Sequence, residues 1–196
     1  MTIKIMIAVI LGLAAGAFFL EGEPAFLGSA LDLGLCLLLF FVGIDIGKNK
    51  DVGRQMKEIG LKAVTTPLLV ATGTIAGSIV FGKLFGYSAK DASLLGAGFG
   101  WYTLSPIIIA PYSAELSALS FLANVTREVL AIISIPLVAK YIGYTEAVAP
   151  AGATAMDTTL PIVAGATDAQ TAIVSFVTGL VLSLSVPVII PIFIGL

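Results

Sequence analysis

The sequence lacks histidine altogether, has one cysteine, and is poor in charge, with 11% charged residues among 196. Soluble domains carry roughly 25% charged residues, so an ordinary soluble fold is excluded. Without histidine, the commonest metal ligand and the one side chain that titrates unaided near neutral pH are both missing. Cys36 has no partner for a disulfide within the chain. Any proton chemistry therefore has to use carboxylates.

Long apolar runs take the place of charge, and 58% of the residues are hydrophobic. About 20 apolar residues span a bilayer as a helix, whereas a barrel would show short alternating segments. The pattern therefore predicts an all-α polytopic membrane protein, with residues 1–196 as a single transmembrane domain. The first run is predicted to be a retained helix and not a cleaved leader. Seven membrane segments are predicted, at 3–20, 26–46, 61–82, 92–112, 114–142, 147–165 and 170–196.

Basic residues predict the orientation in the cell membrane, because cytoplasmic loops are rich in lysine and arginine. The predicted loop at 47–62 carries five of the ten basic residues: Lys48, Lys50, Arg54, Lys57 and Lys62. With this loop in the cytoplasm, the N-terminus is cytoplasmic and the C-terminus is outside.

Two segments have the composition of broken helices. Residues 96–111 and 149–167 combine glycines, prolines and hydroxyl side chains. Glycine and proline weaken a helix, and irregular backbone at membrane depth is tolerated only against protein or a water-filled cavity. Paired interrupted helices point to the binding site of a transporter. The alternative is a pair of kinked but continuous helices.

Ionisable residues lie in the middle of two predicted segments: Arg127 and Glu128 in one, and Asp157 in the next. A charge at the bilayer centre costs at least ~2.5–3.5 kcal/mol on insertion scales, so such groups are candidates for function. Asn124 shares a helix face with both, at i, i+3 and i+4. Possible polar neighbours are Tyr102, Thr103, Ser105, Thr126, Thr154, Thr158 and Thr159.

Two interpretations of these charges remain open. Arg127 can be a permanent partner of Glu128 or Asp157 that only fixes helix packing. Alternatively, since one arginine cannot compensate two carboxylates, the surplus negative charge suits a cationic substrate or a proton. Asp45 and Asp32 lie nearer the ends of their segment and fit interfacial roles better, with a weak case for Asp32 at a gate.

No motif of a hydrolase, transferase or nucleotide-binding protein occurs, so we expect no enzyme. An intramembrane aspartyl protease is disfavoured because no protease-like signature accompanies Asp157. No metal, cofactor or nucleic-acid partner is expected.

Four stretches of the sequence are distinctive: Leu37-Leu-Leu-Phe-Phe-Val-Gly-Ile-Asp45, Gly98-Phe-Gly-Trp-Tyr-Thr-Leu-Ser105, Asn124-Val-Thr-Arg-Glu-Val-Leu-Ala-Ile132 and Gly152-Ala-Thr-Ala-Met-Asp-Thr-Thr-Leu-Pro161. In these stretches the chain resembles the LysO-type lysine exporters, and the resemblance runs over nearly its whole length. The resemblance implies export of L-lysine, and of its analogue thialysine, driven by the proton gradient. It maps the family's intramembrane acidic residues onto Glu128 and Asp157.

The same resemblance implies part of an inverted-repeat fold of the bile-acid-transporter type, in which broken helices cross at the binding site. Substrate or proton binding is then expected at Trp101, Tyr102, Ser105, Asn124, Arg127, Glu128, Thr154, Asp157 and Thr158. Longer family members have extra N-terminal helices, so a homodimer or a complex with a small membrane subunit is expected. The alternatives are a non-transporting membrane subunit and a channel-like component.

Overall fold

The computed structural model describes residues 52–195, together with Leu11, Ala14, Ala15, Leu33 and Leu37. The chain divides into two compact units, residues 1–50 and 51–196, and the continuous described stretch 52–195 belongs to the second. The predicted segments 3–20 and 26–46, with Asp32, Cys36 and Asp45, lie outside the described residues.

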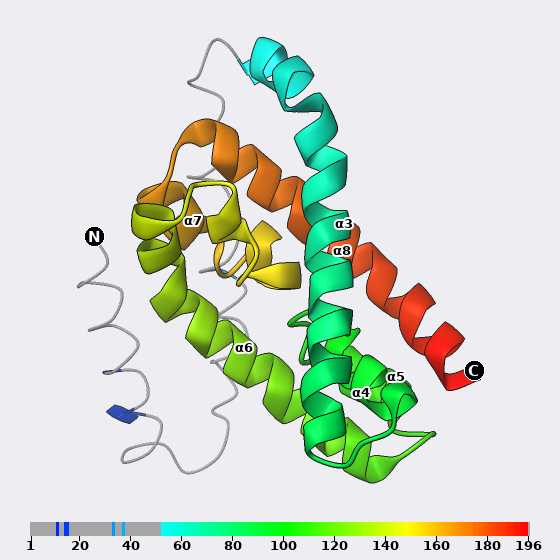
Figure 1. The fold of residues 1–196 in the computed structure, drawn as a ribbon. Helices are drawn as coiled ribbons and strands as arrows, with labels where there is room; N and C mark the ends of the chain where they lie inside the picture. The colour runs from blue at the N-terminus through cyan, green and yellow to red at the C-terminus, as the bar shows by residue number, and fades with distance from the viewer. Residues whose placement is uncertain (1–10, 12–13, 16–32, 34–36, 38–51, 196) are drawn as a thin grey trace. The chain divides into compact units, whose positions relative to one another are not determined.

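Three long helices dominate the second unit (Figure 1). They are α3 (Val52–Leu84), α6 (Ala114–Tyr141) and α8 (Ala169–Gly195). Within them, Ala63–Leu84, Ala114–Tyr141 and Ala169–Gly195 are long and apolar enough to cross a membrane. These confirm three of the predicted segments within one or two residues. Residues 52–195 contain no strand, in agreement with the all-α prediction. The total of seven segments stays a prediction.

The N-terminal end of α3 differs from the sequence-based expectation. Residues 52–59 were predicted to belong to a loop, but they are helical. Gly60 then leaves the helical conformation, with φ 11° and ψ −83°, so two helices meet at a kink. The predicted membrane segment at 61–82 begins directly after that kink.

Both stretches predicted to be broken helices are interrupted. The first consists of α4 (Ala89–Gly96) and α5 (Ser105–Ile109), separated by turns at 97–104. The second consists of two 3₁₀ helices, η1 (Glu146–Val148) and η2 (Gly152–Met156), followed by α7 (Leu160–Ala166). Both α5 and α7 restart with proline in the first turn, where its missing N–H is not needed. We call residues 97–104 the first break and residues 149–159 the second break.

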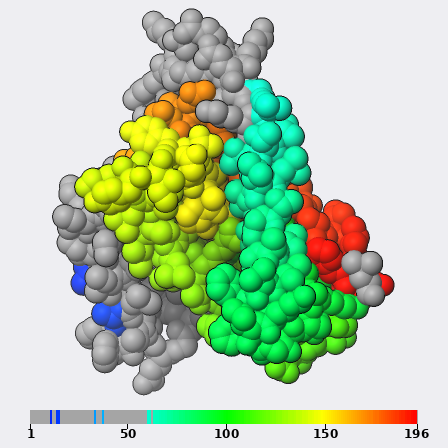
Figure 2. Space-filling model, in the orientation of Figure 1, coloured from blue at the N-terminus to red at the C-terminus, as the bar shows by residue number. Residues whose placement is uncertain are grey.

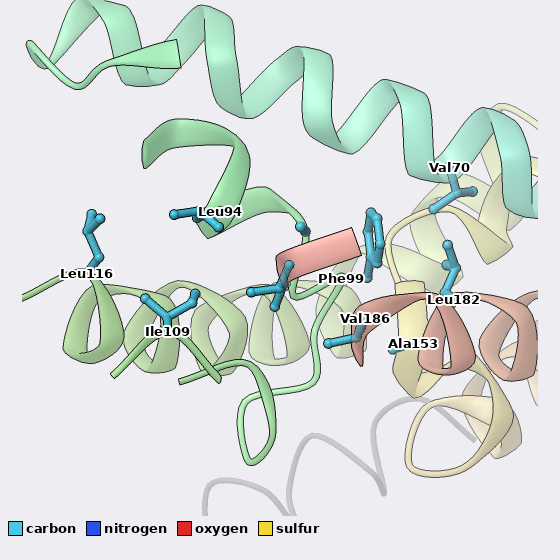
Figure 3. Packing of buried hydrophobic residues seen from close by; sticks show 10 residues of the cluster. Val70, Leu94, Phe99, Ile109, Leu116, Ala153, Leu182 and Val186 are labelled. Atoms are coloured by element: carbon cyan, nitrogen blue, oxygen red, sulfur yellow. The ribbon is translucent and has the colours of Figure 1, made fainter. Parts of the chain in front are cut away.

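The hydrophobic core of this unit lies between the breaks and the long helices. Phe99, from the first break, is completely buried among Val70 of α3, Leu182 and Val186 of α8, and Ala153 of the second break (Figure 3). A fully buried aromatic side chain contributes several kcal/mol through removal of its surface from water or through close packing. The core therefore fixes the two breaks against each other and against α8.

Polar contacts at the helix ends complete the frame. The Ser113 hydroxyl accepts a hydrogen bond from the Leu116 N–H at 3.2 Å and so caps the start of α6. At the far end of α8, the Lys90 ammonium donates to the Ile194 carbonyl at 2.8 Å. A cation at a helix C-terminus satisfies a free carbonyl and complements the helix dipole. These contacts anchor the elements that hold the breaks.

Candidate functional site

The two breaks meet at a direct backbone contact. The Ala153 N–H donates to the Phe99 carbonyl at 2.8 Å. Phe99 itself has a positive φ of 49°, and the next residue, Gly100, has φ 106°. A positive φ is uncommon for a bulky residue and marks a strained position. The crossing is therefore built from backbone in unusual conformations and not from helix surfaces.

Gly152 is the position where this crossing requires glycine. Its φ is 64°, and a Cβ added there would lie 2.9 Å from Nη2 of Arg127 and still closer to the Phe99 carbonyl oxygen. No side chain fits this space without movement of the first break or of the arginine. Glycine is thus demanded twice, by conformation and by contact.

Helix α8 supports the second break from behind. The Ser175 hydroxyl donates to the Ala155 carbonyl at 2.8 Å. Gly179 lies so close to the backbone of Ala153 and Met156 that a Cβ would collide with them. Since a broken helix leaves carbonyl groups unpaired, a hydroxyl donor and a close approach of this kind stabilise it at membrane depth.

Asn124 ties the first break to α6. Its Oδ1 accepts from the Gly100 N–H at 2.7 Å, and its Nδ2 donates to the Ser120 carbonyl at 2.8 Å and to the Ser105 hydroxyl at 3.0 Å. The Ser105 and Ser120 hydroxyls lie 2.9 Å apart. All three side chains are buried. Asn124 and Ser105, both predicted site residues, therefore have a complete set of partners within the protein and hold the break in place.

Arg127 contacts the second break at its beginning. Nε donates to the Pro150 carbonyl at 3.1 Å, Nη2 to the Ala149 carbonyl at 3.1 Å, and Nη1 to the Thr74 hydroxyl of α3 at 3.2 Å. Each of these partners is neutral. The interpretation in which Arg127 pairs with Glu128 or Asp157 is not what the described contacts show.

Glu128 contacts the second break at its end. Its Oε1 accepts from the Thr158 hydroxyl at 2.6 Å. The same hydroxyl lies 3.4 Å from Oδ1 of Asp157, and the Thr158 N–H donates to that oxygen at 2.6 Å. A hydroxyl has one proton to donate, so it serves one carboxylate at a time. The structure therefore brings both predicted carboxylates to one threonine, and all three residues are half-buried.

The remaining predicted residues surround this centre at different distances. Tyr102, half-buried, lies within electrostatic reach of both carboxylates and packs edge-on against Phe121 at 6.2 Å. Trp101 packs against the hydrophobic core. The Thr154 hydroxyl donates to the Ala151 carbonyl at 2.9 Å, so it stabilises the second break internally. The Thr154 carbonyl also accepts the Asp157 N–H at 3.1 Å, so Thr154 lies beside one carboxylate through its backbone.

Sequence reasoning missed two polar contributors, Ser120 and Thr74. Ser120 lies four residues before Asn124 on the same helix face, and this spacing could have identified it. Thr74 is 53 residues from Arg127 in the sequence, and no local pattern connects them. Within residues 52–195, no group of three or more aspartate, glutamate or cysteine residues is placed to hold a metal ion.

The arrangement separates opposite charges along the second break. The guanidinium of Arg127 lies where the break begins and the two carboxylates lie where it ends, although Arg127 and Glu128 are consecutive on α6. Side chains of consecutive helical residues point about 100° apart, which explains the separation. Such a site can receive a cation at the carboxylates without first displacing the arginine.

Comparison with known proteins identifies the family of the chain. The family model described as lysine exporter LysO matches residues 6–194. The chain belongs to the LysO lysine exporter family. It is 31% identical to the lysine exporter LysO of Escherichia coli over 98% of this chain and 64% of that protein's length. It is 28% identical, over 97% of the chain, to a Haemophilus influenzae protein with the name "Putative lysine exporter".

The share of each relative that is matched differs. The chain spans 64% of the length of the E. coli protein and 96% of that of the H. influenzae protein. No solved structure matches the chain, so the likeness to bile-acid-type transporters stays a prediction. Family membership and the apolar helices make the chain a multi-pass membrane protein of a transporter family.

Proposed function

We propose that this protein exports L-lysine, and its analogue thialysine, from the cytoplasm by antiport with protons. The observation that carries the proposal is the pair of half-buried carboxylates, Glu128 and Asp157, gathered around the Thr158 hydroxyl in a chain of the LysO family. The site offers surplus negative charge at a break in a membrane segment. Its natural ligands are a proton and the ε-ammonium group of lysine.

The antiport follows from competition for these carboxylates. Two like charges close together favour uptake of a cation, and they titrate as a coupled pair. A proton and an ammonium group are then alternative occupants, which is the requirement for exchange. Glu128 stands on the continuous helix α6, a rigid place for a proton. Asp157 ends the second 3₁₀ helix, a better place to follow a moving ammonium group.

The membrane orientation is part of the proposal. The basic residues at 47–62 face the cytoplasm, which puts the N-terminus inside and the C-terminus outside. The transport unit is larger than one copy of this chain. Arg127, Glu128 and Asp157 are half-exposed in the described part, and lipid is a costly environment for charge. A second copy of the chain or a small membrane subunit would shield these three side chains from lipid.

The test is lysine export from liposomes. Purified protein should release preloaded radiolabelled lysine when a pH gradient is imposed. The Glu128→Gln variant should lose gradient-driven export and keep measurable lysine binding. Asp157→Asn should weaken lysine binding by about 10- to 150-fold, since a hydrogen bond to a charged group contributes about 1.5–3 kcal/mol. The matched control is Glu115→Gln, an exposed carboxylate in the first turn of the same helix.

Each result separates the alternatives. Parental export by both variants would mean that the intramembrane carboxylates are structural. Reversed behaviour of the two variants would exchange their roles. Flux that neither saturates nor responds to the gradient would indicate a channel. If no lysine flux is measured, even after a small membrane partner is added, the protein would be a non-transporting membrane subunit.

A further inference from the structure

An open cavity of about 1000 Å³ lies between α6 and the stretch from Thr74 of α3 to Leu95 of α4, at the start of the second break. Its walls are largely apolar, with hydroxyl groups from Thr74, Thr126 and Ser134. Arg127 is the one charged residue among the described ones that line it. Sites for small molecules are typically of this kind, roughly 300–1,000 Å³, mostly apolar, with a few convergent polar groups. Figure 2 shows the second break at the surface beside α3, in yellow next to cyan.

The guanidinium of Arg127 keeps unused capacity in this cavity. A guanidinium has five N–H donors, and the three described hydrogen bonds go to two carbonyls and one hydroxyl. These neutral partners orient the group but do not compensate its charge. A cation at membrane depth without a compensating anion is unfavourable. Among the contacts of residues 52–195, the guanidinium therefore has a fixed orientation, two N–H donors that these three hydrogen bonds do not use, and no anionic partner.

We infer that Arg127 binds the α-carboxylate of the amino-acid substrate, with the apolar wall of the cavity against the aliphatic chain. The inference rests on the proposed function and identifies the residue that binds the α-carboxylate end of the substrate. A planar guanidinium matches a carboxylate with two parallel hydrogen bonds, so arginine is suited to this role and lysine is not. The cavity lining contains Arg127 but neither Glu128 nor Asp157, which lie at the other end of the second break. Arg127 would recognise the group that distinguishes an amino acid from a simple diamine, and the carboxylate pair would recognise the ammonium group beyond the cavity.

The opposing explanation is that Arg127 only ties α3, α6 and the second break together. Substrate discrimination separates the two explanations. Cadaverine is lysine without its carboxylate, and norleucine is lysine without its ε-ammonium group. Competition of each compound against radiolabelled lysine should be measured on the full-length protein in detergent, for the parent and for variants of Arg127.

The parent should bind lysine at least about tenfold more tightly than cadaverine, the factor expected for a charged hydrogen-bonded pair. Arg127→Gln should abolish this preference and leave the preference for lysine over norleucine intact. Arg127→Lys keeps the charge without the planar fork, and should lose most of the preference; it carries the test if Arg127→Gln does not fold. Asp157→Asn should show the opposite pattern: the preference for lysine over norleucine should fall, and the preference for lysine over cadaverine should remain.

Glu115→Gln, an exposed carboxylate on the same helix and outside the cavity lining, is the matched control and should retain the preference over cadaverine. Thr74→Val breaks one tie of the guanidinium and leaves its charge in place, so it shows what a purely structural change does. Equal loss of lysine and cadaverine binding in the Arg127 variants, reproduced by Thr74→Val, would make Arg127 a structural tie and overturn the inference. If the Arg127 variants change the preference for lysine over cadaverine only when anionic lipid is present, the arginine binds a lipid headgroup and the inference is also overturned. Failure of the parent to bind lysine would instead refute the proposed function.

Discussion

Substitution of Gly152 by alanine tests whether the crossing of the two breaks is required. The residue has φ 64°, and an added Cβ would lie 3.0 Å from Cζ of Arg127 and against the Phe99 carbonyl oxygen. That carbonyl accepts the Ala153 N–H at 2.8 Å, the bond that joins the breaks. The methyl group therefore acts on the conformation, on the crossing and on the arginine together.

The expected magnitude has two parts. A non-glycine residue in the left-handed region costs about 1–2 kcal/mol, and the net loss of one buried backbone hydrogen bond costs about 0.5–1.5 kcal/mol. Together they reduce the free energy of unfolding by about 1.5–3.5 kcal/mol. For a chain of this size, that corresponds to a fall in Tm of about 3–14 °C.

The assay is thermal unfolding of the purified protein in detergent, followed by lysine export from liposomes. Gly152→Ala should lower Tm within the stated range and reduce export, because the first break or Arg127 must move. The matched control is Gly73→Ala, at an exposed position in helix α3 where an added Cβ meets no described atom within 4 Å. Alanine is the better helix former by about 0.8–1.0 kcal/mol, so this variant should keep or slightly raise Tm. Equal Tm and export for both variants would refute the role given to Gly152.

Two further predictions concern the carboxylate site and the assembly. Thr158→Val keeps the side-chain shape but removes the hydroxyl that donates to Glu128 at 2.6 Å; export should fall roughly tenfold, the loss of one hydrogen bond to a charged group. Thr158→Ser should restore it, and parental export by the valine variant would contradict the shared-hydroxyl site. Mass measurement in native detergent micelles should give a homodimer or a complex with a small membrane protein, and a fully active monomer would exclude both.

The two breaks could be predicted from the sequence because their causes are local. Glycines and prolines at 96–111 and 149–167 weaken helices by their own chemistry, and the prolines of α5 and α7 also mark where helices restart. The long helix α6 follows from a long, mostly apolar run without glycine after the capping residue Ser113. In each case the signal lies within a few residues of the feature that it predicts.

The partners of the charged residues could not be predicted in this way. The i, i+3, i+4 spacing placed Asn124, Arg127 and Glu128 on one face, yet their side chains reach different elements: the first break, the start of the second break and its end. The spacing identifies the face of the helix but not what crosses it. That depends on the contact between Phe99 and Ala153, which are 54 positions apart and which no local pattern relates.

The same contacts link the proposed carboxylate site to the second break. The carbonyls of Ala149 and Pro150, which lie where the helix is interrupted, accept hydrogen bonds from Arg127. In the proposed site, a substrate carboxylate would use the two N–H donors of the guanidinium that the described contacts leave over, beside the start of the second break. Asp157 lies at the end of that break, seven residues after Pro150. Binding at Arg127 and binding at the carboxylates would therefore act on the same short segment, and a change in the conformation of this segment would couple the two ends of the substrate site.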